Sequence, residues 1–305
     1  MTGTVISLQS ESIRVKVIPE LGAQITSLMD SEGHEYLVPG FWPRPEKLPL
    51  TSSFNDGGLG GIDDCLPAVA AGIYPKGPCS GWSIPDHGEL WQRPWHVIES
   101  SPEELIVSIE GVCLPYTLVR RMIIKGESLE IEYQLINHGM FDLPIVWASH
   151  PLLAPTSNMT IDFANKGYLK VEACNMGFAQ DSHITYPIVN IQGQEVDLRS
   201  WSSLPNGFFL KAFSHLHAGS PVRINHVEWG TILEIVTTAN HPIQLGIWFN
   251  RGGFPVDRPV EHFSIEPTFG SADALSRAMV DNSCLTLRAM SDERWHLSYR
   301  VRYQP

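Results

Sequence analysis

The chain has 305 residues, of which 43% are hydrophobic and only 18% charged, a balance that excludes a disordered protein and indicates a large core. Its 33 acidic side chains outnumber the 21 basic ones, and the formal net charge of −12 argues against nucleic acids and anionic membrane surfaces as partners. A neutral ligand fits this charge best.

The five cysteines are widely spread and show no Cys-x-x-Cys spacing: Cys65, Cys79, Cys113, Cys174 and Cys284. This pattern is typical of reduced thiols and predicts neither a zinc knuckle nor a dithiol redox motif. The first residues contain no basic region followed by an apolar stretch, so we expect no signal peptide. No run of about 18 apolar residues predicts a membrane span. We therefore expect a cytoplasmic protein.

Short stretches of alternating hydrophobic and polar residues recur along the chain. They lie at residues 13–18, 105–110, 129–135, 232–236 and 297–303. A period of two in β-branched and aromatic residues, between turns rich in glycine, proline and asparagine, predicts half-buried strands. The 23 prolines and 25 glycines interrupt the chain too often for long amphipathic helices. We predict an all-β sandwich or barrel with antiparallel strands, forming one domain over residues 1–305.

The most irregular stretch, residues 41–94, is rich in glycine, proline and tryptophan and lies inside the strand pattern. A loop of this length within a compact domain is usually functional. Near its end, Asp86 and His87 stand close to Trp91 and Trp95. Aromatic rings beside hydrogen-bonding side chains are typical of sugar sites, because sugar C–H faces stack on rings while hydroxyls need polar partners. The alternative is a structural histidine that Asp86 caps.

Two later segments place titratable side chains in or at the end of apolar strands. Residues 144–151 carry His150 directly before a proline, which keeps His150 extended at the strand end. Residues 262–273 carry Glu266 within an apolar run, where an unpaired carboxylate would be costly. Glu266 should therefore have a partner or a chemical role, whereas a lone histidine at a strand end is often structural.

A further segment, residues 245–253, places Trp248 and Asn250 on one face of a predicted strand, since they are two residues apart. His215 and His217 share a strand face in the same way. No third ligand follows at a useful spacing, so we expect no metal site.

In their order and spacing, these segments resemble the aldose 1-epimerase family of the galactose mutarotase-like superfamily. The resemblance covers most of the chain, from residues 17–37 and 61–95, through Ser149-His150-Pro151, to residues 211–213, 246–250 and 265–268. It implies a large antiparallel β-sandwich with a sugar on its open face, no cofactor and no metal. The implied catalytic residues are His150, Glu266 and His87. The implied substrate-binding residues are Asp64, Asp86, Trp91, Arg93, Lys211, Trp248 and Asn250.

Two departures from the family pattern concern the substrate. Members that act on hexose 6-phosphates share a Gly-Ile-x-x-Cys-x-Pro segment with this chain. They carry an arginine four residues after the following histidine, where this chain has Trp91. Arg93 lies two positions further on, and the missing guanidinium weakens the case for a phosphosugar. The aspartate that holds the sugar in galactose mutarotases has no clear counterpart, and Asp63, Asp64 and Asp86 are the candidates.

The resemblance predicts an aldose 1-epimerase that interconverts the α and β anomers of a free monosaccharide. Glu266 is the expected base at O1, a protonated His150 the acid at O5, and His87 a hydrogen-bond partner near O5. We expect the nearby carboxylate to favour the protonated state of His150.

Three alternatives stay open at this stage. One is a non-catalytic carbohydrate-binding protein on the same fold. Another is an epimerase of uronic acids, in which Arg93 or Arg251 would pair with the substrate carboxylate. The third is a phosphosugar mutarotase. Fold similarity does not choose among them, and the oligomeric state is equally open.

Overall fold

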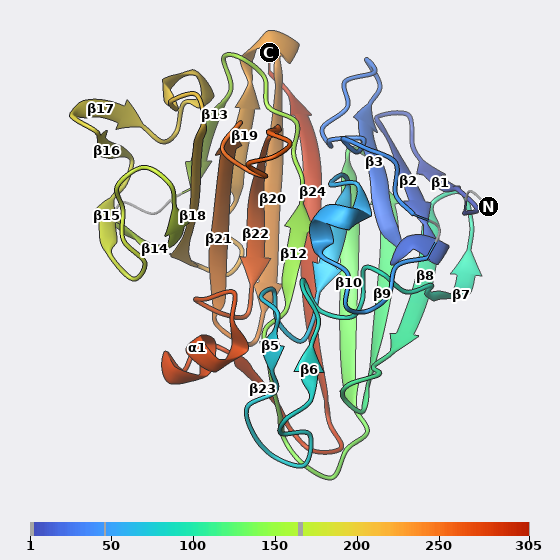
Figure 1. Ribbon diagram of the computed structural model, residues 1–305. Coiled ribbons are helices and arrows are strands. Elements are labelled where there is room, and N and C mark those ends of the chain that lie inside the picture. The colour runs from blue at the N-terminus through green and yellow to red at the C-terminus, as the bar shows by residue number, and fades with distance from the viewer. Residues whose placement is uncertain (1–2, 46, 164–166, 305) are drawn as a thin grey trace.

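The computed structural model describes residues 3–45, 47–163 and 167–304, and two large antiparallel sheets dominate it (Figure 1). Within these ranges the only α-helix is the short α1 (Leu275–Val280). Single 3-10 turns occur at Pro19–Leu21, Phe54–Gly57, Trp201–Ser203 and Val227–Trp229. The prediction of an all-β fold is confirmed. No helix in the described part of the chain is long and apolar enough to cross a membrane.

The first sheet, as far as the described residues show it, has ten strands. In spatial order they are β1 (Ile6–Gln9), β2 (Ile13–Ile18), β3 (Gln24–Asp30), β4 (Ile62–Cys65), β12 (Ala148–Pro151), β22 (Glu261–Thr268), β21 (Ile243–Arg251), β18 (Phe208–Leu216), β14 (Tyr168–Cys174) and β15 (His183–Thr185).

The second sheet has eight strands among the same residues. In spatial order they are β13 (Thr160–Phe163), β19 (Val222–His226), β20 (Thr231–Ala239), β24 (Asp292–Tyr303), β10 (Ser128–Asn137), β9 (Tyr116–Lys125), β8 (Glu104–Glu110) and β7 (His96–Ser100). Three short pairs accompany the sheets: β5 (Gly72–Ile73) with β6 (Ser83–Ile84), β11 (Leu143–Ile145) with β23 (Leu285–Leu287), and β16 (Ile188–Ile191) with β17 (Gln194–Asp197).

The alternating stretches form strands as their pattern predicts. In β2 the side chains of Ile13, Val15 and Val17 are buried, while Arg14 and Lys16 between them are exposed. The same alternation runs along β8, β9 and β10. The inward side chains of both sheets join one hydrophobic cluster. Burial of these apolar faces, at about 25 cal/mol per Å², is what drives the two sheets together.

The irregular stretch 41–94 contains a central strand, β4, that the sequence pattern did not predict. Strand β4 pairs with β3 on one side and with β12 on the other, so it lies deep in the ten-stranded sheet. All four of its residues are buried, including Asp63 and Asp64. Two carboxylates in a four-residue strand remove the hydrophobic pattern by which strands are recognised.

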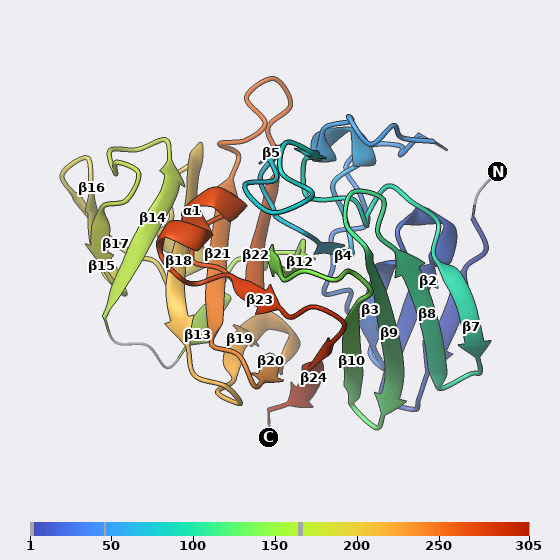
Figure 2. The ribbon, with the colours of Figure 1, turned by 90° about the horizontal axis from the view of Figure 1, so that it is seen from below.

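The order of strands in the ten-stranded sheet positions the candidate site. Strands β12, β22, β21 and β18 are consecutive neighbours, although they come from distant parts of the chain (Figure 2). Side chains that lie opposite one another in adjacent strands share a face of the sheet. The register pairs Lys211 with Trp248, Gly246 with Glu266, and Ala148 with Thr268. His150, Lys211, Trp248 and Glu266 therefore lie on the same face.

Candidate active site

A pocket of about 280 Å³ lies over these central strands. The strands contribute His150, Lys211, Trp248, His262 and Glu266 to its lining. Loops contribute Phe54, Asp86, His87, Phe254 and Asp273, among others. The pocket thus combines titratable groups from three strands with aromatic rings, the combination that small-molecule sites use to orient and bind a ligand.

Glu266 forms an ion pair with Lys211, although strand β21 separates the two strands that carry them. Lys211 Nζ donates a hydrogen bond to Glu266 Oε2, and both side chains are buried. Gly246 of β21 lies between them, and a Cβ atom there would come within 3.1 Å of Glu266 Oε2. The absence of a side chain at Gly246 therefore leaves room for the pair. Glu266 has the partner that its burial predicted.

Asp273 completes this charged group from a loop beyond β22. Its Oδ1 lies 3.5 Å from Lys211 Nζ. Burial alone would lower the pKa of Lys211, but the charges of Asp273 and Glu266 outweigh it and raise that pKa above its ordinary value. Burial raises the pKa of Asp273, against the opposing effect of Lys211. Lys211 is thus a buried ammonium held between two carboxyl groups.

His150 lies against the other oxygen of Glu266, with 3.6 Å between Nε2 and Oε1. Burial lowers the pKa of His150 well below its ordinary value, and the neighbouring His87, Lys211 and His262 lower it further. The expectation that a nearby carboxylate favours a protonated His150 is therefore wrong for the resting site. Lys211 already neutralises Glu266, and desolvation disfavours a second cation beside it.

His87 enters the pocket from the loop after β6. Its Nδ1 lies 2.8 Å from Asp86 Oδ1, and its ring stacks on Phe54 at 4.1 Å between centroids. The rings of His87 and His150 meet edge to face at 4.9 Å. Burial would raise the pKa of Asp86, but hydrogen bonds from His87, Ser53 and the Phe54 amide hold it at about 2.

The backbone around His87 is specified by its neighbour Gly88. Gly88 has a φ of +76°, and a Cβ atom there would come within 2.1 Å of the Leu66 carbonyl oxygen. Only glycine fits such an approach. The His87 amide donates to the Val69 carbonyl, and the amides of Val69 and Ala70 donate to the Asp273 carbonyl. The loops that carry His87 and Asp273 are therefore tied together.

Trp248 forms an aromatic wall of the pocket. Its Nε1 donates to His262 Nε2 over 3.0 Å, and its ring packs against Phe209 and Phe254. Burial lowers the pKa of His262 to about 3, so the ring that accepts this hydrogen bond is neutral. Asn250 is fully buried behind them, where its side chain bonds to the backbone of Gly253 and Phe254. Asn250 therefore shapes the loop rather than lining the pocket.

Three other residues predicted to bind substrate lie outside the pocket, and the structure corrects them. Asp64 points into the core, where Arg120, Tyr133 and Trp147 donate to its carboxylate over 2.6 to 3.1 Å. Asp63 pairs with His150 in the register and so lies on the pocket face of the sheet. Adjacent residues of a strand face opposite sides, so Asp64 lies on the core face. Asp63 is also buried, and it bonds to Gln24 over 2.8 Å.

Trp91 is fully buried and supports the site from beneath. Its Nε1 donates to the Asp86 carbonyl over 2.9 Å, and its ring meets Phe54 edge to face. Arg93 lies further away and donates to the carbonyl of Glu110 over 2.8 Å. Neither residue is in a position to contact a sugar in the pocket.

Phe54, His262 and Asp273 are among the lining residues that sequence reasoning missed. His262 and Asp273 are the two ends of the segment that carries Glu266, and their titratable side chains were a usable signal. Phe54 lies in the irregular stretch 41–94 and carries no local sign of function.

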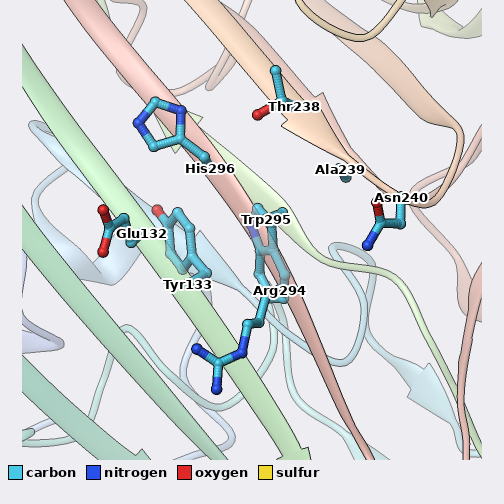
Figure 3. A pocket seen from close by; sticks show the side chains of 8 residues that line it. All are labelled: Glu132, Tyr133, Thr238, Ala239, Asn240, Arg294, Trp295 and His296. Carbon is cyan, nitrogen blue, oxygen red and sulfur yellow. The ribbon is translucent and has the colours of Figure 1, made fainter.

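A separate hollow of about 430 Å³ lies on the eight-stranded sheet, over β10, β20 and β24 (Figure 3). It is open, and it holds none of the residues predicted for the site. Two of its aromatic side chains, Tyr133 and Trp295, stack at 5.0 Å as part of the core. The predicted catalytic residues His150, Glu266 and His87 therefore lie in the smaller pocket, on the other sheet.

Comparisons with known proteins match the chain only at the level of structure. No protein-family model matches it, and no curated protein does. The Slr1438 protein from Synechocystis sp. PCC 6803 has a similar structure with a TM-score of 0.75 and 17% identity, over 100% of this chain and 97% of that one. A galactose mutarotase-like protein from Lactobacillus casei has a TM-score of 0.70 and 14% identity, over 98% and 100%.

An aldose epimerase homologue from C. elegans has a TM-score of 0.69 and 14% identity, with 100% of both chains covered. Identities this low establish the fold and not the activity. The chain has the galactose mutarotase-like fold, in agreement with the resemblance seen in its sequence.

Proposed function

We propose that this protein is an aldose 1-epimerase that interconverts the anomers of a free, uncharged aldose in this pocket. The observation that carries the proposal is the meeting of Glu266, His150 and His87 at one pocket with Trp248 on its wall. A carboxylate and an imidazole placed together are the groups needed to take a proton from one sugar oxygen and return one to another. The shared fold with galactose mutarotase-like proteins supports the same reaction class.

The charges of the pocket favour a neutral substrate. Among the described lining residues Lys211 is the one lysine or arginine, and Glu266 and Asp273 already surround it. A phosphate or carboxylate group would therefore lack a free cationic partner. Arg93 and Arg251, which an epimerase of acidic sugars would need, donate instead to backbone carbonyls outside the pocket.

We assign Glu266 as the base that removes the proton from O1. His87 is then the proton donor to O5, because its Nδ1 lies against the Asp86 carboxylate. The low pKa of Asp86 keeps that carboxylate charged. His150 lies between Glu266 and His87 and is a neutral hydrogen-bond partner of the sugar. This assignment differs from the sequence-based one, in which a protonated His150 was the acid.

In the forward step C1 and O1 form a carbonyl, the C1–O5 bond breaks, and O5 takes the proton of His87. Rotation about C1–C2 and closure from the other face, with both protons returned, inverts C1. Each proton transfer contributes on the order of 10²–10⁴-fold to the rate.

The test is anomer exchange measured by NMR magnetisation transfer with a panel of free aldoses, hexose 6-phosphates and uronic acids. We expect acceleration above the buffer rate for at least one free aldose and none for the charged sugars. Binding of a free aldose with exchange at the buffer rate would show a carbohydrate-binding protein instead of an enzyme. Acceleration confined to charged sugars would contradict the neutral-substrate assignment.

A further inference from the structure

We propose that Phe54 is a positioning residue for the proton donor His87, and that the turn Phe54–Gly57 with its N-cap Ser53 holds the Asp86–His87 pair in its working geometry. This inference deepens the proposed function and rests on it, because it concerns His87 as the group that protonates O5. Phe54 gives and takes no proton in the reaction. Its role is to fix the ring that does.

His87 has a backbone conformation that needs support from its surroundings. Its φ is +57°, in the left-handed region that residues other than glycine rarely adopt, and Gly88 follows with a φ of +76°. In an extended chain successive side chains point to opposite sides. Here the neighbouring side chains of Asp86 and His87 meet instead, with 2.8 Å between Oδ1 and Nδ1. A left-handed residue of this kind persists only where the contacts around it over-determine it.

The turn Phe54–Gly57 supplies such contacts to the carboxylate of the pair. The Phe54 amide donates to Asp86 Oδ2 over 2.8 Å, and Ser53 Oγ donates to the same oxygen over 3.2 Å. The turn does not need Asp86 for its own closure, because Ser53 and Asp56 cap each other through reciprocal hydrogen bonds. Oδ2 is thus held by the turn, while Oδ1 is left for His87.

The ring of Phe54 holds the imidazole of the pair. It stacks on His87 with 4.1 Å between centroids and 13° between planes, and it meets His150 edge to face at 5.0 Å. A phenyl ring has no hydrogen-bonding atoms, so it fixes the plane of the imidazole without competing for its nitrogens. Because Asp86 occupies Nδ1, the other nitrogen, Nε2, is the one that serves the sugar.

Trp91 supports both the turn and the loop that carries His87. The buried Phe54 ring meets Trp91 edge to face at 5.2 Å. Gly57, at the end of the turn, lies so close to Trp91 that a Cβ atom there would come within 2.7 Å of Cζ3. Trp91 also donates to the Asp86 carbonyl over 2.9 Å. One buried tryptophan therefore sets how far the turn lies from the His87 loop.

The first test is the rate of anomer exchange in folded Phe54→Leu, measured by magnetisation transfer over a range of aldose concentrations. Leucine keeps an apolar side chain beside Trp91 but presents no ring face to His87. The imidazole can then turn away from O5, and a misplacement of about 1 Å can cost about 10²-fold in rate. We expect kcat to fall by about 10- to 100-fold and KM to change by less than about two-fold, because the donor acts in the transition state.

The second test reads the pair directly, by ¹⁵N NMR of the histidine side chains. The His87 Nδ1–H group, hydrogen-bonded to Asp86, should give a resolved signal that is missing in His87→Gln. This signal should broaden or disappear in Phe54→Leu as the group exchanges with water. Ser53→Ala removes one of the two hydrogen bonds from the turn to Asp86 Oδ2, and kcat should fall by about two- to five-fold with a weaker signal.

Phe163→Leu is the matched control. Phe163 is a buried phenylalanine of β13, on the other sheet, and its ring stacks on Tyr186 at 4.2 Å. The substitution removes a similar stacked ring from the core but touches no residue of the pocket. It should keep the wild-type kcat and the His87 signal even where it lowers the free energy of unfolding.

Wild-type kcat in folded Phe54→Leu, an unchanged His87 signal, or an equal loss in Phe163→Leu would overturn the inference. If Phe54→Leu does not fold, wild-type kcat and signal in Ser53→Ala would overturn it in the same way. The proposed function is read separately, from exchange in the wild type. Exchange at the buffer rate, with a His87 signal that depends on Phe54, rejects the enzymatic function and leaves the positioning of His87.

Discussion

Replacement of Glu266 by glutamine should separate catalysis from folding. The side chain keeps its size but loses its basicity, so anomer exchange should fall by about 10²–10⁴-fold, the contribution of one positioned base. The fold should survive, because Glu266, Asp273 and Lys211 carry two negative charges and one positive charge. The substitution leaves Lys211 paired with Asp273. We expect the free energy of unfolding to fall by about 1–3 kcal/mol, the scale of one charged hydrogen bond.

The assay is magnetisation transfer between the anomers of the best free aldose, with urea unfolding of the same samples. Glu261→Gln is the matched control, since Glu261 is an exposed glutamate at the start of the same strand. It should retain wild-type exchange. If folded Glu266→Gln keeps more than about a tenth of wild-type activity, the loss is smaller than removal of a base can explain, and the assignment of Glu266 is wrong.

Three further outcomes follow from the buried titratable side chains. Lys211→Met leaves two buried carboxyl groups without their cation, and urea unfolding should show a loss of about 3–5 kcal/mol. Asp64→Asn should cost a similar amount, because it breaks a fully buried pair with Arg120, while calorimetry shows no change in the sugar affinity of the folded protein. His262 has a pKa of about 3 when folded and an ordinary value of 6.5, so the unfolded chain binds a proton below pH 6.5 that the native protein does not. The stability of wild type relative to His262→Asn should therefore fall by about 2 kcal/mol between pH 7 and pH 5, and a constant difference in urea unfolding over this range would contradict a neutral, buried His262.

The sequence by itself determined the class of fold and the segments that carry the chemistry. Alternation with a period of two marks strands such as β2 and β8, because successive side chains of a strand point to opposite faces of the sheet. This pattern depends only on residues that are close in the sequence. The same local argument placed His150 at a strand end and required a partner for Glu266.

Tertiary structure decided which side chains meet, because the sequence of a single strand does not specify which strands become its neighbours in the sheet. Lys211 reaches Glu266 only because β18, β21 and β22 are neighbours and Gly246 leaves a gap between them. The inward direction of Asp64 follows from the register of β4 with β12. The protonation of His150 depends on burial and on charges brought from three separate segments, so no local pattern could predict it.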